Sequence, residues 1–132
     1  MGIAEELQIL TFKAGERIIS QGQQSDKAYM ILSGKVRVFM EEGTKVVELA
    51  TLGEDEIFGE SAIFSGEAYG ANVEAIEEAE LYVITKDSLN EMLKNADPII
   101  RALIQMLIAR LNTTNEALLK SETREFIDVA LI

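Results

Sequence analysis

The 132-residue sequence contains no cysteine and no histidine. These absences exclude disulfides, the usual zinc sites and iron–sulfur ligation. They also remove the imidazole that the commonest general-base and triad mechanisms need. Only carboxylates, lysines and tyrosines remain for acid–base chemistry. We therefore expect a protein that is not an enzyme and that has no catalytic residue and no metal.

Positive charge is scarce as well, with 12 lysines and arginines against 23 aspartates and glutamates and a net charge of −11. Binding to nucleic acid or to an anionic membrane needs clustered basic residues, so this composition argues against both partners. No segment approaches the roughly 18 consecutive apolar residues of a membrane span. The N-terminus lacks the charged-then-apolar pattern of a signal peptide. We expect a soluble cytoplasmic protein.

Short apolar segments separated by glycine fill the chain from Leu7 to about residue 84. The run from Lys35 to Met40 alternates polar and apolar residues, so we expect Val36 and Val38 to face a core. Glu42-Gly43-Thr44 predicts a hairpin tip. The pattern predicts a mainly-β fold, an antiparallel β-roll (double-stranded jelly roll) with flanking short helices and a long C-terminal helix.

The hydrophobic period changes after Ile84, where Thr85 to Lys94 predicts a short helix. Asp97-Pro98 is a strong helix start, an N-cap carboxylate followed by proline at the first helical position, and it predicts a long helix over 98–120. Two apolar stripes follow this helix. The seam consists of Ile100, Ile104, Leu107, Leu111, Thr114 and Leu118, and the second stripe of Ile99, Leu103 and Met106.

Two stripes favour a helix that packs against its own roll and against a partner, so we expect a parallel homodimer through helix 98–120. A helix buried on both sides within one chain is the alternative. The length fits one domain, which we place over residues 1–120 and which includes this helix. A polar and then apolar tail follows over residues 121–132.

The stretch from Phe58 to Val73 carries the candidate site. It predicts a strand end, a helical turn that opens at Gly59-Glu60-Ser61, a loop of small residues and another strand. Free backbone N–H groups at a helix start can bind an anion, and glycine lets a ligand approach the backbone closely. The stretch resembles the phosphate-binding cassette of the cyclic nucleotide-binding domain family. The glycine spacing of residues 22–34 resembles that family too, and the resemblance covers roughly residues 7 to 120.

The resemblance implies the sensor module of bacterial regulators of the cAMP receptor and fumarate–nitrate type, with a long helix that forms the dimer seam. In that family, the glutamate at the position of Glu60 binds the ribose hydroxyl, and an arginine nine residues later holds the cyclic phosphate. Tyr69 occupies the arginine position here. The ligand-binding positions implied by the resemblance are Gly59, Glu60, Ser61, Tyr69, Gly70 and Ala71. Residues 121–132 leave no room for the helix-turn-helix of the regulators, which indicates either a stand-alone module or a piece of a longer chain.

The absence of an arginine at position 69 determines which ligand we expect. Removing the cationic partner of a buried charge costs about 3–5 kcal/mol, whereas a helix start returns only about 0.3–1 kcal/mol. Residues 41–91 contain fourteen carboxylates, two lysines and no arginine, a net charge of −12. We therefore expect no cofactor and a cassette that does not hold cyclic AMP or cyclic GMP in the usual way. A neutral or cationic small molecule would suit Glu60 better.

Two interpretations of Tyr69 remain open at this stage. Its ring could simply pack over the roll, or it could occupy the space of the arginine while its hydroxyl hydrogen-bonds Glu60. Three further functions also remain. The chain could be a genuine cyclic nucleotide sensor that uses Arg101 or Arg110 from the C-terminal helix or a partner subunit. It could be a structural protein-interaction module with a filled pocket, or a small cupin-like enzyme, which the absence of histidine disfavours.

Overall fold

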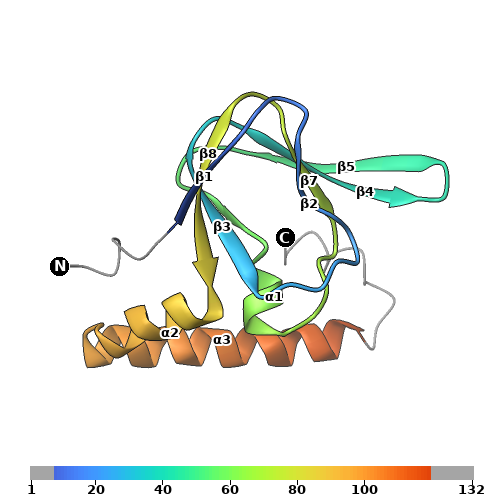
Figure 1. Cartoon of the computed structure of the whole chain (residues 1–132). Coiled ribbons are helices and arrows are strands. Elements are labelled where there is room, and N and C mark those ends of the chain that lie inside the picture. Colours follow the sequence, from blue (N-terminus) through green and yellow to red (C-terminus); the bar gives the residue numbers. More distant parts are fainter. Residues whose placement is uncertain (1–7, 120–132) are drawn as a thin grey trace.

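The computed structural model describes residues 8–119 (Figure 1). The strands are β1 (Gln8–Phe12), β2 (Arg17–Ile19), β3 (Lys27–Ser33), β4 (Val36–Glu42), β5 (Lys45–Leu52), β6 (Ile57–Phe58), β7 (Asn72–Ala75) and β8 (Ala79–Thr85). The helices are α1 (Glu60–Phe64), α2 (Lys86–Lys94) and α3 (Pro98–Leu119). The expectations for the start of the chain and for the tail over 121–132 concern residues outside the described range.

Two antiparallel sheets form the roll. One has the strand order β1-β8-β3-β6 and the other the order β2-β7-β4-β5. The helices lie at one end of the roll, and the β4–β5 hairpin projects from its side (Figure 1). The predicted mainly-β antiparallel roll is confirmed. Cassette residues that are close in sequence thereby lie between strands of different sheets, because β6 belongs to the first sheet and β7 to the second.

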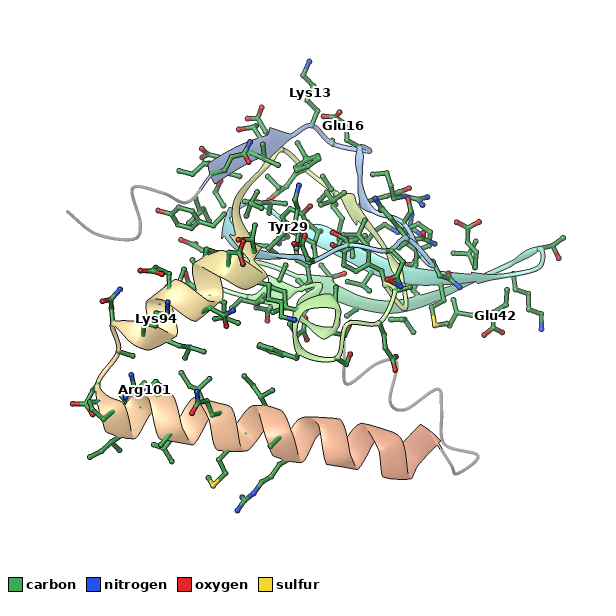
Figure 2. All side chains as sticks on the ribbon, turned by 60° about the horizontal axis from the view of Figure 1, so that its bottom comes forward. Lys13, Glu16, Tyr29, Glu42, Lys94 and Arg101 are labelled. Carbon is green, nitrogen blue, oxygen red and sulfur yellow. The ribbon has the colours of Figure 1, made fainter. Side chains whose placement is uncertain are left out.

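The core lies between the two sheets and follows the predicted alternation. Val36 and Val38 are fully buried, whereas Lys35 is exposed, as expected from the sequence. Tyr29 points into the roll and stacks on Phe58 with ring centroids 5.4 Å apart (Figure 2). Aromatic pairs at this distance add to the stability gained from burial alone. The cassette therefore begins, at Phe58, on a fixed part of the core.

The helix boundaries follow local capping chemistry. The Thr85 hydroxyl accepts a hydrogen bond from the Ser88 backbone N–H at 3.0 Å, and the Ser88 hydroxyl accepts one from the Thr85 N–H at 2.9 Å, which caps α2. Asp97 accepts a hydrogen bond from the Ile99 N–H at 2.8 Å. The predicted start of the long helix at Pro98 is confirmed, and the helix is described as far as Leu119.

Helix α3 lies below α1 and α2 in the view of Figure 1, and several of its apolar residues are exposed to solvent. Ile104 is half-buried. The exposed apolar residues of the helix are Ile99, Ile100, Leu103, Met106 and Leu107. The other predicted seam members, Leu111, Thr114 and Leu118, have side chains outside the described part of the chain. Over residues 8–119, no helix is long and apolar enough to cross a membrane.

Candidate functional site around helix α1

Gly59 sets the geometry at the start of the cassette. It has a left-handed backbone (φ 80°) and is the N-cap residue of α1. A Cβ atom at this position would lie 3.0 Å from Ile19 Cδ1 and 3.3 Å from both the Lys27 carbonyl oxygen and Tyr69 Cε1. Only glycine adopts this conformation readily and fits such close packing. The space beside Gly59 is therefore occupied by neighbouring groups, the Tyr69 ring among them.

Tyr69 is buried in the hydrophobic core, with 5% of its surface exposed. Its hydroxyl donates a hydrogen bond to the Lys27 carbonyl at 2.6 Å. Its backbone N–H donates to the Gln23 carbonyl at 3.1 Å, and its carbonyl accepts from the Gly22 N–H at 2.8 Å. Of the two interpretations of Tyr69, the structure agrees with the ring that packs in the roll; the hydroxyl does not hydrogen-bond Glu60, because the Lys27 carbonyl takes its proton. Tyr69 is tied to β3 and to the loop before it.

The Tyr69 phenol stays neutral at physiological pH. Burial raises its pKa, the negative charge of Asp26 adds to this effect, and a hydrogen bond with Ser25 opposes it. Burial also raises the pKa of Tyr29, and the charge interaction with Tyr69 raises it further. A neutral phenol cannot replace the positive charge of a guanidinium beside a buried anion.

Glu60 is the first residue of α1, and its carboxyl lacks compensation. The Oε2 atom is buried and has no hydrogen-bond partner among the residues that the structure describes. Burial raises the pKa of Glu60 to about 7, although a hydrogen bond from its own backbone N–H opposes the shift. An unpartnered buried acceptor is unfavourable, and more so when it is ionised. The carboxyl thus titrates within the physiological range.

The remaining predicted site residues lie in three different surroundings. The Ser61 carbonyl accepts hydrogen bonds from the backbone N–H and the hydroxyl of Ser65, which ends α1. Ala71 is buried in the core, whereas Gly70 is exposed. The structure therefore brings Gly59 and Tyr69 into contact and leaves Gly70 on the surface.

Asn72 is a buried polar residue at the end of the cassette that the sequence analysis missed; 3% of its surface is exposed. Its Oδ1 accepts hydrogen bonds from Arg17 Nη1 and from the Gln21 backbone N–H, both at 2.8 Å. Its Nδ2 donates to Glu41 at 3.2 Å. A single asparagine between Ala71 and Val73, in a segment otherwise typical of a buried strand, is the signal that could have pointed to it.

Arg17, Arg37 and Glu74 form a charge cluster on the sheet of β2, β4, β5 and β7. Glu74 pairs with Arg17 at 3.0 Å and with Arg37 at 3.1 Å, and Arg37 also pairs with Glu48. The two guanidinium carbons lie 5.1 and 4.0 Å from the centroid of the Phe39 ring. Glu74 is therefore held between two arginines, with 22% of its side chain exposed.

This cluster also corrects the expected field of the acidic segment. Arg17 and Arg37 precede that segment in sequence, but the sheet brings them to its carboxylates, and Arg17 also lies 3.8 Å from Glu41. The charges of this cluster are not among the causes that shift the pKa of Glu60, which burial raises. Among the described residues, the ion pairs of arginine with carboxylates thus lie on the sheet surface.

A hollow lies away from the cassette, between α2 and α3. It has a volume of about 460 Å³ and is lined by Asp87, Asn90, Glu91, Leu93, Lys94, Arg101 and Gln105. Figure 2 shows Lys94 and Arg101 on the facing helices. Within residues 8–119, no group of three or more Asp or Glu side chains is placed to hold a metal ion.

Comparisons with known proteins point to the same family as the cassette. The cyclic nucleotide-binding domain profile matches residues 9–96. The CRP-like cAMP-activated global transcriptional regulator of Mycobacterium tuberculosis is 27% identical over 117 residues, which are 88% of this chain and 52% of that protein. The cAMP-dependent protein kinase type II regulatory subunit of Drosophila melanogaster is 37% identical over 75 residues, which are 57% of this chain and 20% of that protein. The chain thus spans about half the length of the bacterial regulator.

Among solved structures, the half-site-occupied form of the EAL enzyme Bd1971 has a TM-score of 0.80 and 32% identity, covering 83% of this chain and 98% of the matched chain. The cAMP-bound form of Bd1971 has a TM-score of 0.64 and 31% identity over 83% of this chain and 30% of the matched chain. Its cGMP-bound form has a TM-score of 0.65 and 31% identity over 86% and 30%. These likenesses agree with the fold described above.

Proposed function

Because this chain belongs to the cyclic nucleotide-binding domain family, we propose that it is a non-catalytic regulatory module of that family that does not hold cyclic AMP or cyclic GMP in the usual way. The observation that carries the proposal is the position of Tyr69. The residue at the arginine position is a buried, neutral tyrosine, and its ring lies against Gly59. A cytoplasmic location stays a prediction from the sequence.

Binding of a cyclic phosphate would carry two energetic costs. A cyclic phosphate entering beside Gly59 would have to displace the Tyr69 ring and break its hydrogen bond to the Lys27 carbonyl. The buried phosphate would then lie near Glu60 without a cationic partner, which costs about 3–5 kcal/mol. That cost corresponds to roughly two to three and a half decades in the dissociation constant.

Calorimetry with cyclic AMP and cyclic GMP tests this proposal. We expect no micromolar binding by the wild-type protein and at least a hundredfold gain for Tyr69→Arg, which restores the cation. Tyr69→Phe is the matched control, since it removes the hydroxyl without adding charge. Micromolar binding by the wild type would refute the proposal, and an unchanged Tyr69→Arg variant would show that more than the arginine is missing.

We also propose that the module forms a homodimer through α3. Ile99 is 70% exposed, Leu103 47% and Leu107 58%, so a row of apolar side chains faces solvent on one helix. Burying such a stripe against a second copy removes apolar area from water, at about 25 cal/mol per Å². Sedimentation analysis should give a dimer, and Leu107→Glu should shift it to monomer without loss of fold. A wild type that stays monomeric at about 100 µM, which means an association weaker than about −5.5 kcal/mol, would contradict the proposal.

A second function stays open because the related enzyme Bd1971 has been solved in cAMP-bound and cGMP-bound forms. In this alternative, the chain is a genuine sensor that takes its cation from Arg101 or Arg110 of a second copy. Arg101 lines the hollow between α2 and α3, and Arg110 is exposed. If the wild type binds a cyclic nucleotide, Arg101→Ala and Arg110→Ala identify the source of the charge. If it binds none, a structural interaction module with the site filled by Tyr69 remains.

A further inference from the structure

The proposed function leaves the buried carboxyl of Glu60 without a role. This carboxyl belongs to the first residue of α1, directly after the left-handed Gly59. Its Oε2 atom is excluded from water and has no hydrogen-bond partner among the described residues. A buried carboxylate in such a place is strongly unfavourable, whereas a protonated carboxyl is neutral and tolerated.

Within residues 8–119, the charged and titratable groups near α1 do not supply a partner. Helix α1 packs against β3, whose titratable side chains are Lys27 and Tyr29. Asp26 precedes β3, and Tyr69 comes from the segment after α1. Lys27 and Asp26 are exposed, and burial raises the pKa of both phenols, so these stay neutral. A proton is therefore the group that neutralises Glu60 in the closed arrangement.

We propose that Glu60 is a proton-operated latch on the cassette: the protonated carboxyl keeps α1 packed against β3 with Tyr69 over Gly59, and loss of the proton loosens α1 and releases Tyr69. An ionised Oε2 must reach water, and movement of α1 away from the roll would expose it. The helix has five residues and depends on its packing for stability. The latch rests on the proposed function in one respect, namely that Tyr69 rather than a bound phosphate closes the site.

The direction of the effect follows from proton linkage. The pKa of Glu60 lies near 7 in the folded protein, above the ordinary value of 4.5. The closed form therefore keeps a proton that the opened form loses between these two values. Opening of α1 becomes easier as pH rises through this range, and it levels off above about pH 7.

Backbone hydrogen exchange measured without nucleotide tests the latch. We consider the amides of residues 59–70, with their exchange rates corrected for intrinsic exchange. We expect their protection in the wild type to fall at least tenfold between pH 5 and pH 8. This factor of about ten is smaller than the change that proton linkage allows. Glu60→Gln, which cannot ionise, should show no such fall. Glu67→Gln, at an exposed carboxyl of the same segment, is the matched control and should behave as the wild type.

Carbon-13 NMR of the wild-type Glu60 carboxyl gives an independent reading. We expect a titration midpoint near pH 7. A midpoint near 4.5, or equal pH dependence in Glu60→Gln, would overturn the latch. If Glu60→Gln does not fold, the wild-type titration decides alone. Nucleotide binding in calorimetry would refute the proposed function without changing these readings, whereas failure of the latch would leave the calorimetric result as it stands.

Discussion

The cassette and the charge cluster on the sheet of β2, β4, β5 and β7 neutralise a carboxyl group in opposite ways. Glu74, whose side chain is 22% exposed, accepts ion pairs from both Arg17 and Arg37. Glu60 has a buried oxygen with no partner among the described residues. One carboxylate is held by two cations, and the other is neutralised by a proton.

The difference shows in the direction of the pKa shifts. A hydrogen bond from Arg37 is the main cause that lowers the pKa of Glu48 in the cluster. Burial is the main cause that raises the pKa of Glu60. Carboxylates of the first kind contribute stability above their ordinary pKa and lose it in acid, whereas Glu60 destabilises the fold as pH rises. Carboxylates of one acidic segment therefore differ in the direction of their pKa shifts, because each pKa depends on the groups around that carboxylate.

Glu60→Gln, which removes the titratable carboxyl, should have the largest effect on the free energy of unfolding. The difference in unfolding free energy between the wild type and Glu60→Gln should fall by about 3 kcal/mol from pH 4.5 to pH 7, since a shift of one pKa unit is worth about 1.4 kcal/mol. Above pH 7 it should stay constant. Chemical denaturation at several pH values measures it, and a difference that rises with pH would contradict the assigned cause.

Gly59→Ala tests the packing around the latch. The left-handed backbone costs an alanine about 1–2 kcal/mol, and its Cβ would also press on Ile19 and on the Lys27 carbonyl. We expect a total loss of about 2 kcal/mol or more. Gly22→Ala is the matched control, because Gly22 has a φ of 84° and nothing within 4 Å of its added Cβ. Equal losses at the two positions would mean that crowding contributes nothing.

Local patterns were enough to predict the roll and the position of the cassette. The alternation around Val36, the capping pair Asp97-Pro98 and the turn at Gly59 each depend on a few neighbouring residues, and the structure confirms all of them. The family resemblance is likewise confirmed.

The partners inside the site could not be predicted because they come from segments that are distant in the sequence. Tyr69 and Lys27 are 42 positions apart, and Arg17 and Glu74 are 57 apart. Arg17 and Glu74 meet through the pairing of β2 with β7, which sequence spacing does not specify. The partner of the Tyr69 hydroxyl could not be found from the sequence, since the backbone carbonyl of Lys27 carries no signal there.

Glu74→Gln should have a smaller effect than either change in the cassette. It removes the charge between Arg17 and Arg37 but keeps a hydrogen-bonding side chain, and the arginines are about a third exposed. We expect a loss of about 1 kcal/mol that shrinks at high salt. Glu78→Gln, at an exposed carboxyl outside the cluster, should cost less than half as much. Equal losses would show that the cluster contributes nothing beyond surface charge.

Glu48→Gln should have the smallest effect and the opposite sign of pH dependence from Glu60→Gln. Glu48 is exposed, so solvent screens its pair with Arg37. Its pKa is lowered, mainly by the hydrogen bond from Arg37, so the stability that it contributes is present above pH 4.5 and is lost as pH falls through the folded pKa. Denaturation curves below pH 5 should therefore converge for Glu48→Gln and the wild type, whereas those of Glu60→Gln and the wild type change between pH 4.5 and pH 7. If both variants changed in the same direction, the contrast between a carboxylate paired with arginine and one neutralised by a proton would be wrong.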